Sequence, residues 1–278
     1  LPVRVSATVR GIAPDFPDYG GFSFDAPRGK TTAQGNGEED EPSSADTMRV
    51  VADKLPATLS REGTGRVVID KLVAPARPEQ LLIEASYADP NGEIQTVQHS
   101  STLWPAAVVA GIQAERWVSV DRALKLQALA LDLHGKPLAG MPLDVKALAR
   151  ITTTTRKRMV GGFYTYDSHT TVKDLGTVCT GKSDARGLLA CTARLTQPGE
   201  VELVAIAHDA GARQSQAAAT VWVTRQGELW FGGENDDRMD VLPEKRSYRA
   251  GETARFQVRM PFRRATALVA VEREGIVS

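Results

Sequence analysis

Two cysteines, Cys179 and Cys191, carry the clearest chemistry of this sequence. The residues between them include Ser-Asp-Ala-Arg-Gly, a turn pattern in which Gly187 can adopt a left-handed backbone. Ala185 is midway between the cysteines, so a hairpin turning there would place them opposite each other, close enough for a disulfide. Two buried free thiols are the alternative, and a zinc half-site is disfavoured because no His or second Cys pair has ligand spacing. A bridge implies an oxidising compartment.

The other candidate residues do not form a catalytic or metal-binding pattern. No Ser or Cys in a nucleophile motif such as Gly-x-Ser-x-Gly accompanies the four histidines, which are His99, His134, His169 and His208. Three aspartates begin turns, where a carboxylate accepts backbone N–H bonds, and no Asp-x-Asp spacing supports calcium. They are Asp132, Asp184 and Asp209. We therefore predict no catalytic residue, no metal site, no cofactor and no small-molecule substrate.

The overall charge argues against polyanion binding. The 34 Lys and Arg residues balance 34 Asp and Glu residues, so we expect no nucleic-acid partner and no attraction to anionic lipid. Apolar residues make up 42% of the sequence but form no run long enough for a membrane span. Residue 1 opens no secretion-signal pattern, so any export signal or anchor is expected outside these 278 residues.

Short alternating strands separated by turns dominate the chain, and no long window shows helical periodicity. The turn sequences recur at a spacing typical of β-sandwiches. They are YADPNGEI (87–94), LDLHGKPL (131–138), SDARGLLA (183–190) and HDAGARQS (208–215). The sequence predicts an all-β protein.

Two segments repeat strand by strand, which indicates tandem modules. LPVRVSATVR at 1–10 matches MPLDVKALAR at 141–150, and RPEQLLIEASYADPNG parallels QPGEVELVAIAHDAG. We expect modules at 1–104 and 105–225, the first without its initial strands. Ser247 to Val271 parallels Trp117 to Val145, so 226–278 is expected to begin a third, truncated module.

The alternation also predicts which side chains are buried. We expect inward-facing positions at Trp117, Leu124, Leu126, Ala128, Leu203, Ala205 and Phe256. Either face of the strand around Trp222 could be the buried one. Trp104 and Trp230 are expected to pack at module junctions. In the last strand, Ala267, Val269 and Val271 share one face, with Leu268 and Ala270 on the other.

Two further segments are unusual. The stretch 151–172 combines Arg156, Lys157 and Arg158 with a Gly-Gly turn and three aromatic residues. A long hairpin with paired Thr and Tyr side chains and a charged edge is favoured, while a partner-binding ribbon and a nucleic-acid site are alternatives. The polar, acidic stretch 28–46 is expected to be a disordered loop between strands; a bait role is the alternative.

Residues 234–277, ENDDRMDVLPEKRSYRAGETARFQVRMPFRRATALVAVEREGIV, resemble the opening of the bait-region domain of a bacterial α2-macroglobulin. The resemblance is carried by Tyr-x-x-Gly-Glu-x-Ala-x-Phe and by Val-Glu-Arg-Glu-Gly at 271–275. The first of these motifs comprises Tyr248, Gly251, Glu252, Ala254 and Phe256. The two preceding modules are similar to the macroglobulin-like domains of that family, including Asp-x-x-Gly turns at 89–92, 132–135 and 184–187. The implied fold is a series of macroglobulin-like, immunoglobulin/fibronectin-III-like antiparallel β-sandwiches.

The resemblance implies a non-enzymatic, broad-spectrum protease inhibitor. In the family a target protease cuts a bait segment, the modules rearrange and the protease is trapped. This sequence would then be scaffold, with target proteases as partners through a bait outside it. The Cys-x-Glu-Gln thioester motif of many members is absent from these residues. The implied location is the bacterial periplasm, with inner-membrane attachment through a segment outside this sequence and contacts to other envelope proteins left open. A structural or adhesive stack of sandwich modules on the cell envelope is the alternative function.

Overall fold

The computed structural model describes residues 1–29, 48–70, 72–158, 164–225, 240–245, 247–259, 266 and 268. These residues form antiparallel strands, one parallel strand pair and one short 3-10 helix, η1 (Pro17–Tyr19), which confirms the all-β prediction. No helix of the described residues is long and apolar enough to cross a membrane.

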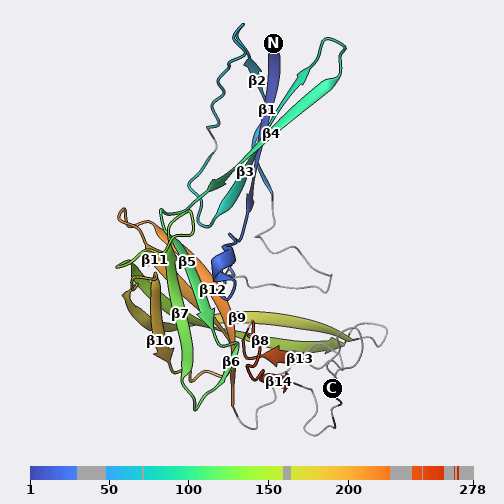
Figure 1. Ribbon diagram of the computed structural model, residues 1–278. Coiled ribbons are helices and arrows are strands. Elements are labelled where there is room, and N and C mark those ends of the chain that lie inside the picture. Colours follow the sequence, from blue (N-terminus) through green and yellow to red (C-terminus); the bar gives the residue numbers. More distant parts are fainter. Residues whose placement is uncertain are drawn as a thin grey trace.

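The described strands form four sheets (Figure 1). A four-stranded sheet, here called the first unit, has the order β2-β1-β3-β4. Its strands are β1 (Pro2–Gly11), β2 (Arg49–Thr58), β3 (Glu79–Ala88) and β4 (Ile94–Leu103). The second unit consists of a three-stranded sheet, β10-β7-β5, and a five-stranded sheet, β6-β12-β11-β8-β9. Its strands are β5 (Val109–Ala114), β6 (Trp117–Ser119), β7 (Leu124–Leu131), β8 (Pro142–Arg158), β9 (Tyr164–Lys182), β10 (Leu188–Ala193), β11 (Gly199–His208) and β12 (Gln214–Thr224). The fourth sheet pairs β13 (Asp240–Pro243) with β14 (Phe256–Arg259).

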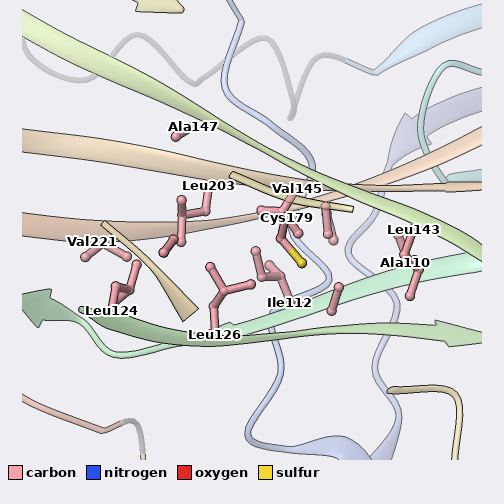
Figure 2. Packing of buried hydrophobic residues seen from close by; sticks show 14 of the residues in the cluster. Ala110, Ile112, Leu124, Leu126, Leu143, Val145, Ala147, Cys179, Leu203 and Val221 are labelled. Atoms are coloured by element: carbon pink, nitrogen blue, oxygen red, sulfur yellow. The ribbon is translucent and has the colours of Figure 1, made fainter. Parts of the chain in front are cut away.

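The second unit is a β-sandwich with a hydrophobic core between its two sheets (Figure 2). Alternate residues of each strand face inward because side chains of a strand point to opposite faces of the sheet. The predicted core residues Leu124, Leu126, Ala128, Leu203 and Ala205 are all buried there. The sequence pattern therefore predicted the register of β7 and β11 correctly.

Trp117 does not face the core, and the prediction that it does is wrong. Val118 occupies the core position of β6, so the alternation places Trp117, half-buried, on the outer face of the five-stranded sheet. There it lies opposite Trp222 of β12, whose neighbours Val221 and Val223 point inward. The strand β6 is only three residues long, too short for its alternation to indicate which face is buried.

The sheet of the first unit repeats half of the sandwich. Val5 lies opposite Ala85 where β1 pairs with β3, and at the equivalent position of the second unit Val145 lies opposite Ala205. The strand order β2-β1-β3-β4 thus corresponds to β9-β8-β11-β12. The apolar face of the first unit contains a small cluster of buried residues, namely Ala7, Val9, Val51, Ala52 and Leu81. Among the described residues of the first unit there is no second sheet over this face.

Four Asp turns connect strands in the same way. In each turn the Oδ1 atom of the first residue accepts backbone N–H bonds from the residues two and four positions later, at 2.8–3.0 Å. The aspartates are Asp89, Asp132, Asp184 and Asp209. They are turn residues, as the sequence indicated.

The ribbon β13–β14 forms a sheet of its own and adds no strand to the second unit. Phe256, expected in a core, is 56% exposed, so this prediction is wrong. The described part of the ribbon has two strands and no second layer against which Phe256 could pack. Leu268 is also exposed. The predictions for Trp230, Ala267, Val269, Ala270 and Val271 lie outside the described residues.

Candidate functional site: the strap and the two edges of the sandwich

The segment that follows β1, residues 12–29, leaves the first unit and lies on the second (Figure 1). We call it the strap. Its aromatic half covers the outer face of the three-stranded sheet, where Phe24 is buried against Val109, Leu129 and Leu131. Phe16, Tyr19, Phe22 and Trp104 pack around this cluster. Trp104 thus packs at the junction of the two units, as predicted.

Two glycines of the second unit allow the aromatic rings to approach. A Cβ atom added at Gly111 would lie 2.8 Å from Cε1 of Phe24, and one at Gly135 would lie 2.8 Å from Cδ1 of Phe16. The two rings also meet edge to face, with centroids 5.0 Å apart. The outer face is therefore shaped to receive this part of the strap.

The strap then crosses the edge of the sandwich between β5 and β12. Ser23 exchanges two backbone hydrogen bonds with Ile112 of β5, at 2.8 and 3.0 Å. The Ser23 hydroxyl donates to the carbonyl oxygen of Ala218 on β12 at 2.7 Å, and the Ala218 N–H donates to the Asp25 carbonyl at 2.8 Å. One short segment of the first unit thus ties together both sheets of the second unit.

A buried ion pair holds the end of the strap. Glu202 is only 1% exposed, and its Oε1 accepts the backbone N–H of Arg28 at 2.8 Å. Its Oε2 accepts two bonds from the Arg150 guanidinium, at 2.8 and 3.1 Å. Arg150 also donates to the carbonyl oxygen of Arg28 at 2.8 Å. Glu202 and Arg150 are both buried and pair with each other, so removal of one would leave the charge of the other buried and unpaired.

The Arg28 side chain adds a more exposed contact, with its guanidinium donating to Glu200 and, at 3.3 Å, to the hydroxyl of Thr220. Beside these residues a cleft of about 760 Å³ opens between the strap and the edge of the sandwich. Its lining includes Ser23, Asp25, Arg28, Ile112, Leu126 and Cys191. None of the described histidines lines this cleft.

A second junction contact involves Asp209. Its Oδ2 accepts the backbone N–H of Ala107, in the segment that enters the second unit, at 3.0 Å. This bond, with further N–H bonds from Arg213 and Gly211, lowers the pKa of Asp209 to about 2. The turn between β11 and β12 thus carries a carboxylate held in its charged form by the incoming chain.

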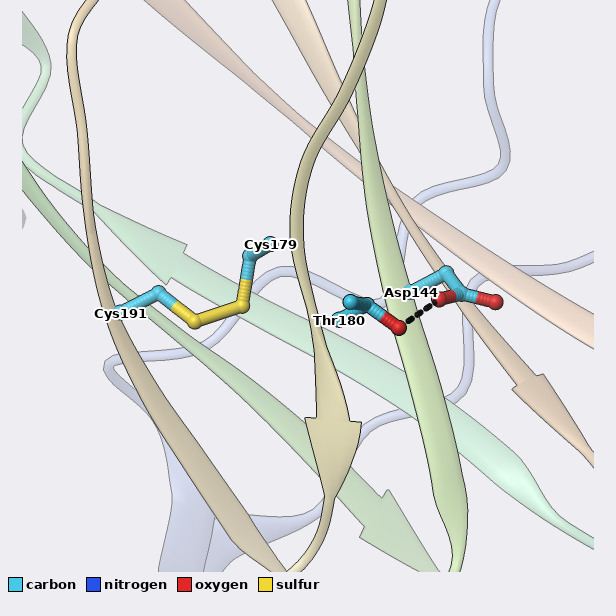
Figure 3. Close-up of a disulfide and its surroundings, with 4 residues drawn as sticks. All are labelled: Asp144, Cys179, Thr180 and Cys191. Atoms are coloured by element: carbon cyan, nitrogen blue, oxygen red, sulfur yellow. Dashed lines mark hydrogen bonds between the residues drawn. A yellow bond between two sulfur atoms is a disulfide. The ribbon is translucent and has the colours of Figure 1, made fainter.

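The predicted disulfide between Cys179 and Cys191 is present, but not across a hairpin (Figure 3). Cys179 is on β9 of the five-stranded sheet, and Cys191 is on β10 of the three-stranded sheet. The turn at 184–187 therefore passes the chain from one sheet to the other, and the bridge, with Cα atoms 6.1 Å apart, joins the two sheets. The hairpin prediction was wrong because β10 pairs with β7 and β9 pairs with β8.

The sandwich is consequently fastened at both edges. The disulfide closes the edge formed by β9 and β10, and the strap closes the edge formed by β5 and β12. Beside the strap, the buried Ser215 hydroxyl of β12 also accepts the N–H of Ala110 on β5 at 3.2 Å. The strap, the disulfide and the Ser215–Ala110 bond thus hold the two sheets of the second unit together.

The structure does not bring the histidines together. They lie on four different elements: His99 on β4, His134 in the turn after β7, His169 on β9 and His208 on β11. The described residues contain no group of three or more His, Cys, Asp or Glu placed to hold a metal ion.

Sequence reasoning missed Ser23, Arg28, Arg150 and Glu202. The dense aromatic run FPDYGGFSF at 16–24 was the available signal for the strap. Glu202 gave none, since its place in the alternation is that of an ordinary solvent-facing residue.

Comparison with known proteins shows which sequences and folds this chain resembles. No protein-family model matches the chain. The α2-macroglobulin homolog of Nostoc sp. strain PCC 7120 is 22% identical over 197 residues, which cover 70% of this chain and 10% of that protein. Two crystal structures of Salmonella α2-macroglobulin, one of a mutant and one reacted with methylamine, match 94% of this chain and 16% of theirs. Both have 16% identity and a TM-score of 0.51.

The chain spans about a tenth of the length of the curated relative that it matches. The relative shows similarity of sequence, and the Salmonella structures show similarity of fold. Taken with the tandem β-units of the structure, these matches confirm that this chain resembles part of a bacterial α2-macroglobulin.

Proposed function

We propose that this chain is a scaffold segment of a bacterial α2-macroglobulin-type protease inhibitor, which traps proteases after they cleave a bait outside these residues. The proposal is supported chiefly by the series of repeated β-units, whose sequence and fold resemble proteins of that name. In this proposal the segment is non-catalytic and target proteases are the partners of the whole protein. The interior disulfide fits an oxidising compartment, for which we propose the periplasm.

The geometry of the second unit suits rigid-body movement. A protease trap that responds to cleavage of a distant bait needs units that keep their internal structure while the contacts between units change. The second unit has a continuous core and two fastened edges, so it resists internal shear. The strap, with the Ala107–Asp209 contact, forms a defined joint to the first unit.

The test is protease challenge of the full-length protein that contains this chain. Limited amounts of trypsin or elastase should produce one preferred cut outside residues 1–225, a large mobility shift on native gels and retained activity on small but not on macromolecular substrates. A protein that only spaces domains on the envelope would be degraded without a mobility shift and would leave the protease fully active on macromolecules. That second result would replace the inhibitor proposal with the structural one.

A further inference from the structure

The repeat gives the strap a counterpart in the second unit. Because β1 and β2 correspond to β8 and β9, the connection between β1 and β2, which begins with the strap, corresponds to the connection between β8 and β9. In the first unit the described start of this connection, the strap, docks on the unit that follows along the chain. In the second unit the corresponding described residues form the far part of the long β8–β9 ribbon.

Both connections leave their sheets at the end from which the chain proceeds to the next unit. In the first unit Arg10 lies opposite Gln80, and Gln80 lies opposite Thr102, directly before the end of β4. In the second unit Arg150 lies opposite Glu200, and Glu200 lies opposite Trp222, near the end of β12. The strap and the ribbon are thus aimed in the same way, each toward its following unit.

The ribbon extends beyond the sheet that supports it. Pairing of β8 with β11 ends at Arg150, whereas pairing of β8 with β9 continues to Arg158, opposite Tyr164 (Figure 1). At its base the hydroxyls of Thr152 and Thr170 lie 2.9 Å apart. A two-stranded ribbon is marginally stable alone in water, so a partner surface would stabilise this extension.

The next unit begins at the same end of the second unit. The Arg116 N–H donates to the carbonyl oxygen of Glu244, just after β13, at 3.1 Å, and the adjacent Trp117 lies opposite Trp222. The ribbon β13–β14 exposes Val241, Phe256 and Val258.

We propose that the β8–β9 ribbon, Ile151–Arg158 with Tyr164–Thr171, is the arm by which the second unit holds the unit that follows it, of which β13–β14 is the described part. The strap and the ribbon are then equivalent devices: in each unit the same connection reaches forward and binds the next unit. The proposal concerns assembly within the chain and does not depend on protease trapping.

The first experiment shortens the ribbon. In the full-length protein, residues 152–170 are replaced by Asn-Gly, which joins Ile151 to Thr171, residues that lie opposite each other. Hydrogen exchange of the segment 240–259 should become at least about tenfold faster, while exchange of β11 stays unchanged. Unchanged exchange of 240–259 would overturn the proposal.

A smaller excision decides the matter if the shortened protein fails to fold. Residues 154–168 are replaced by Asn-Gly, which joins Thr153 to His169, residues that lie opposite each other, and keeps the Thr152–Thr170 contact. Exchange of 240–259 should again become about threefold faster or more, while exchange of β11 stays unchanged. Unchanged exchange of 240–259 in this variant would show that the ribbon does not hold the following unit.

Discussion

Ser23 and Ala218 belong to different units, yet the Ser23 hydroxyl donates a 2.7 Å hydrogen bond to the Ala218 carbonyl oxygen. Since the backbone of Ser23 pairs with Ile112 at the same time, this one residue connects two sheets and two units. The joint between the units is therefore also part of the wall of the sandwich. A substitution at the joint should therefore change the stability of the second unit, and the first predictions test this coupling.

Replacement of Ser23 by Ala should remove the side-chain link to Ala218 while leaving the backbone bonds of the strap to Ala218 and Ile112. The hydroxyl also contacts the exposed Asp25 carboxylate, but the bond to the part-buried Ala218 carbonyl should dominate, and its loss should lower the free energy of unfolding of the second unit by about 1 kcal/mol. Urea denaturation followed by tryptophan fluorescence measures this change. Ser60→Ala, in an exposed turn of the first unit, is the control and should leave the second unit unaffected. An equal change in both variants would contradict the coupling.

Replacement of Glu202 by Ala should leave the Arg150 guanidinium buried without its carboxylate. The expected loss in unfolding free energy is about 3–5 kcal/mol, because an unpaired buried charge is strongly destabilising. Glu200→Ala is the matched control on the same strand. Its side chain pairs with the more exposed Arg28 guanidinium, so its loss should stay below about 1 kcal/mol. Similar losses for both variants would show that the buried pair does not hold the strap end.

Acid should weaken the contact between the turn at Asp209 and the incoming chain. The backbone N–H of Ala107 and other N–H donors lower the pKa of Asp209 to about 2, from an ordinary value of 3.8. A depressed pKa stabilises the fold above the unfolded value, and this contribution is lost as pH falls from about 4 toward 2. Denaturant titrations across that range should show a smaller decline for Asp209→Asn than for the wild type. A decline of the same size in both proteins would rule out this contribution.

Loss of the disulfide should release the edge formed by β9 and β10. Replacement of Cys179 and Cys191 by Ser is expected to cost about 3 kcal/mol on the chain-entropy account of a short loop. Mass measurement under non-reducing conditions of the protein produced in an oxidising compartment provides the direct check. Two thiols open to alkylation in that protein would contradict the bridge.

The sequence predicted those parts of the fold that depend on regular alternation. Leu203 and Ala205 sit in a long strand whose pattern allows one buried face, and both proved buried. In contrast, Trp117 belongs to a strand of three residues, and Phe256 to a two-stranded ribbon, so alternation did not determine their exposure.

The candidate site was less accessible to sequence reasoning. The pairing of Cys179 with Cys191 was predicted correctly from a wrong local picture, because a turn signal does not reveal whether the chain stays in one sheet or changes sheets. Glu202 and Ser23 depend on partners far away in the sequence, such as Arg28 and Ala218. Such partners follow from the arrangement of whole units and not from local periodicity.

The strap has a consequence for the order in which the protein matures. Ser23 and Ala218 are 195 positions apart, and the strap is synthesised first. At translation rates of ~5–20 residues per second, the aromatic residues of the strap wait about 10 to 40 s for β12 to emerge. During that interval Phe22 and Phe24 have no sandwich to cover, so they stay accessible to chaperones. The joint between the first and second units is therefore completed only after β12 of the second unit has been synthesised.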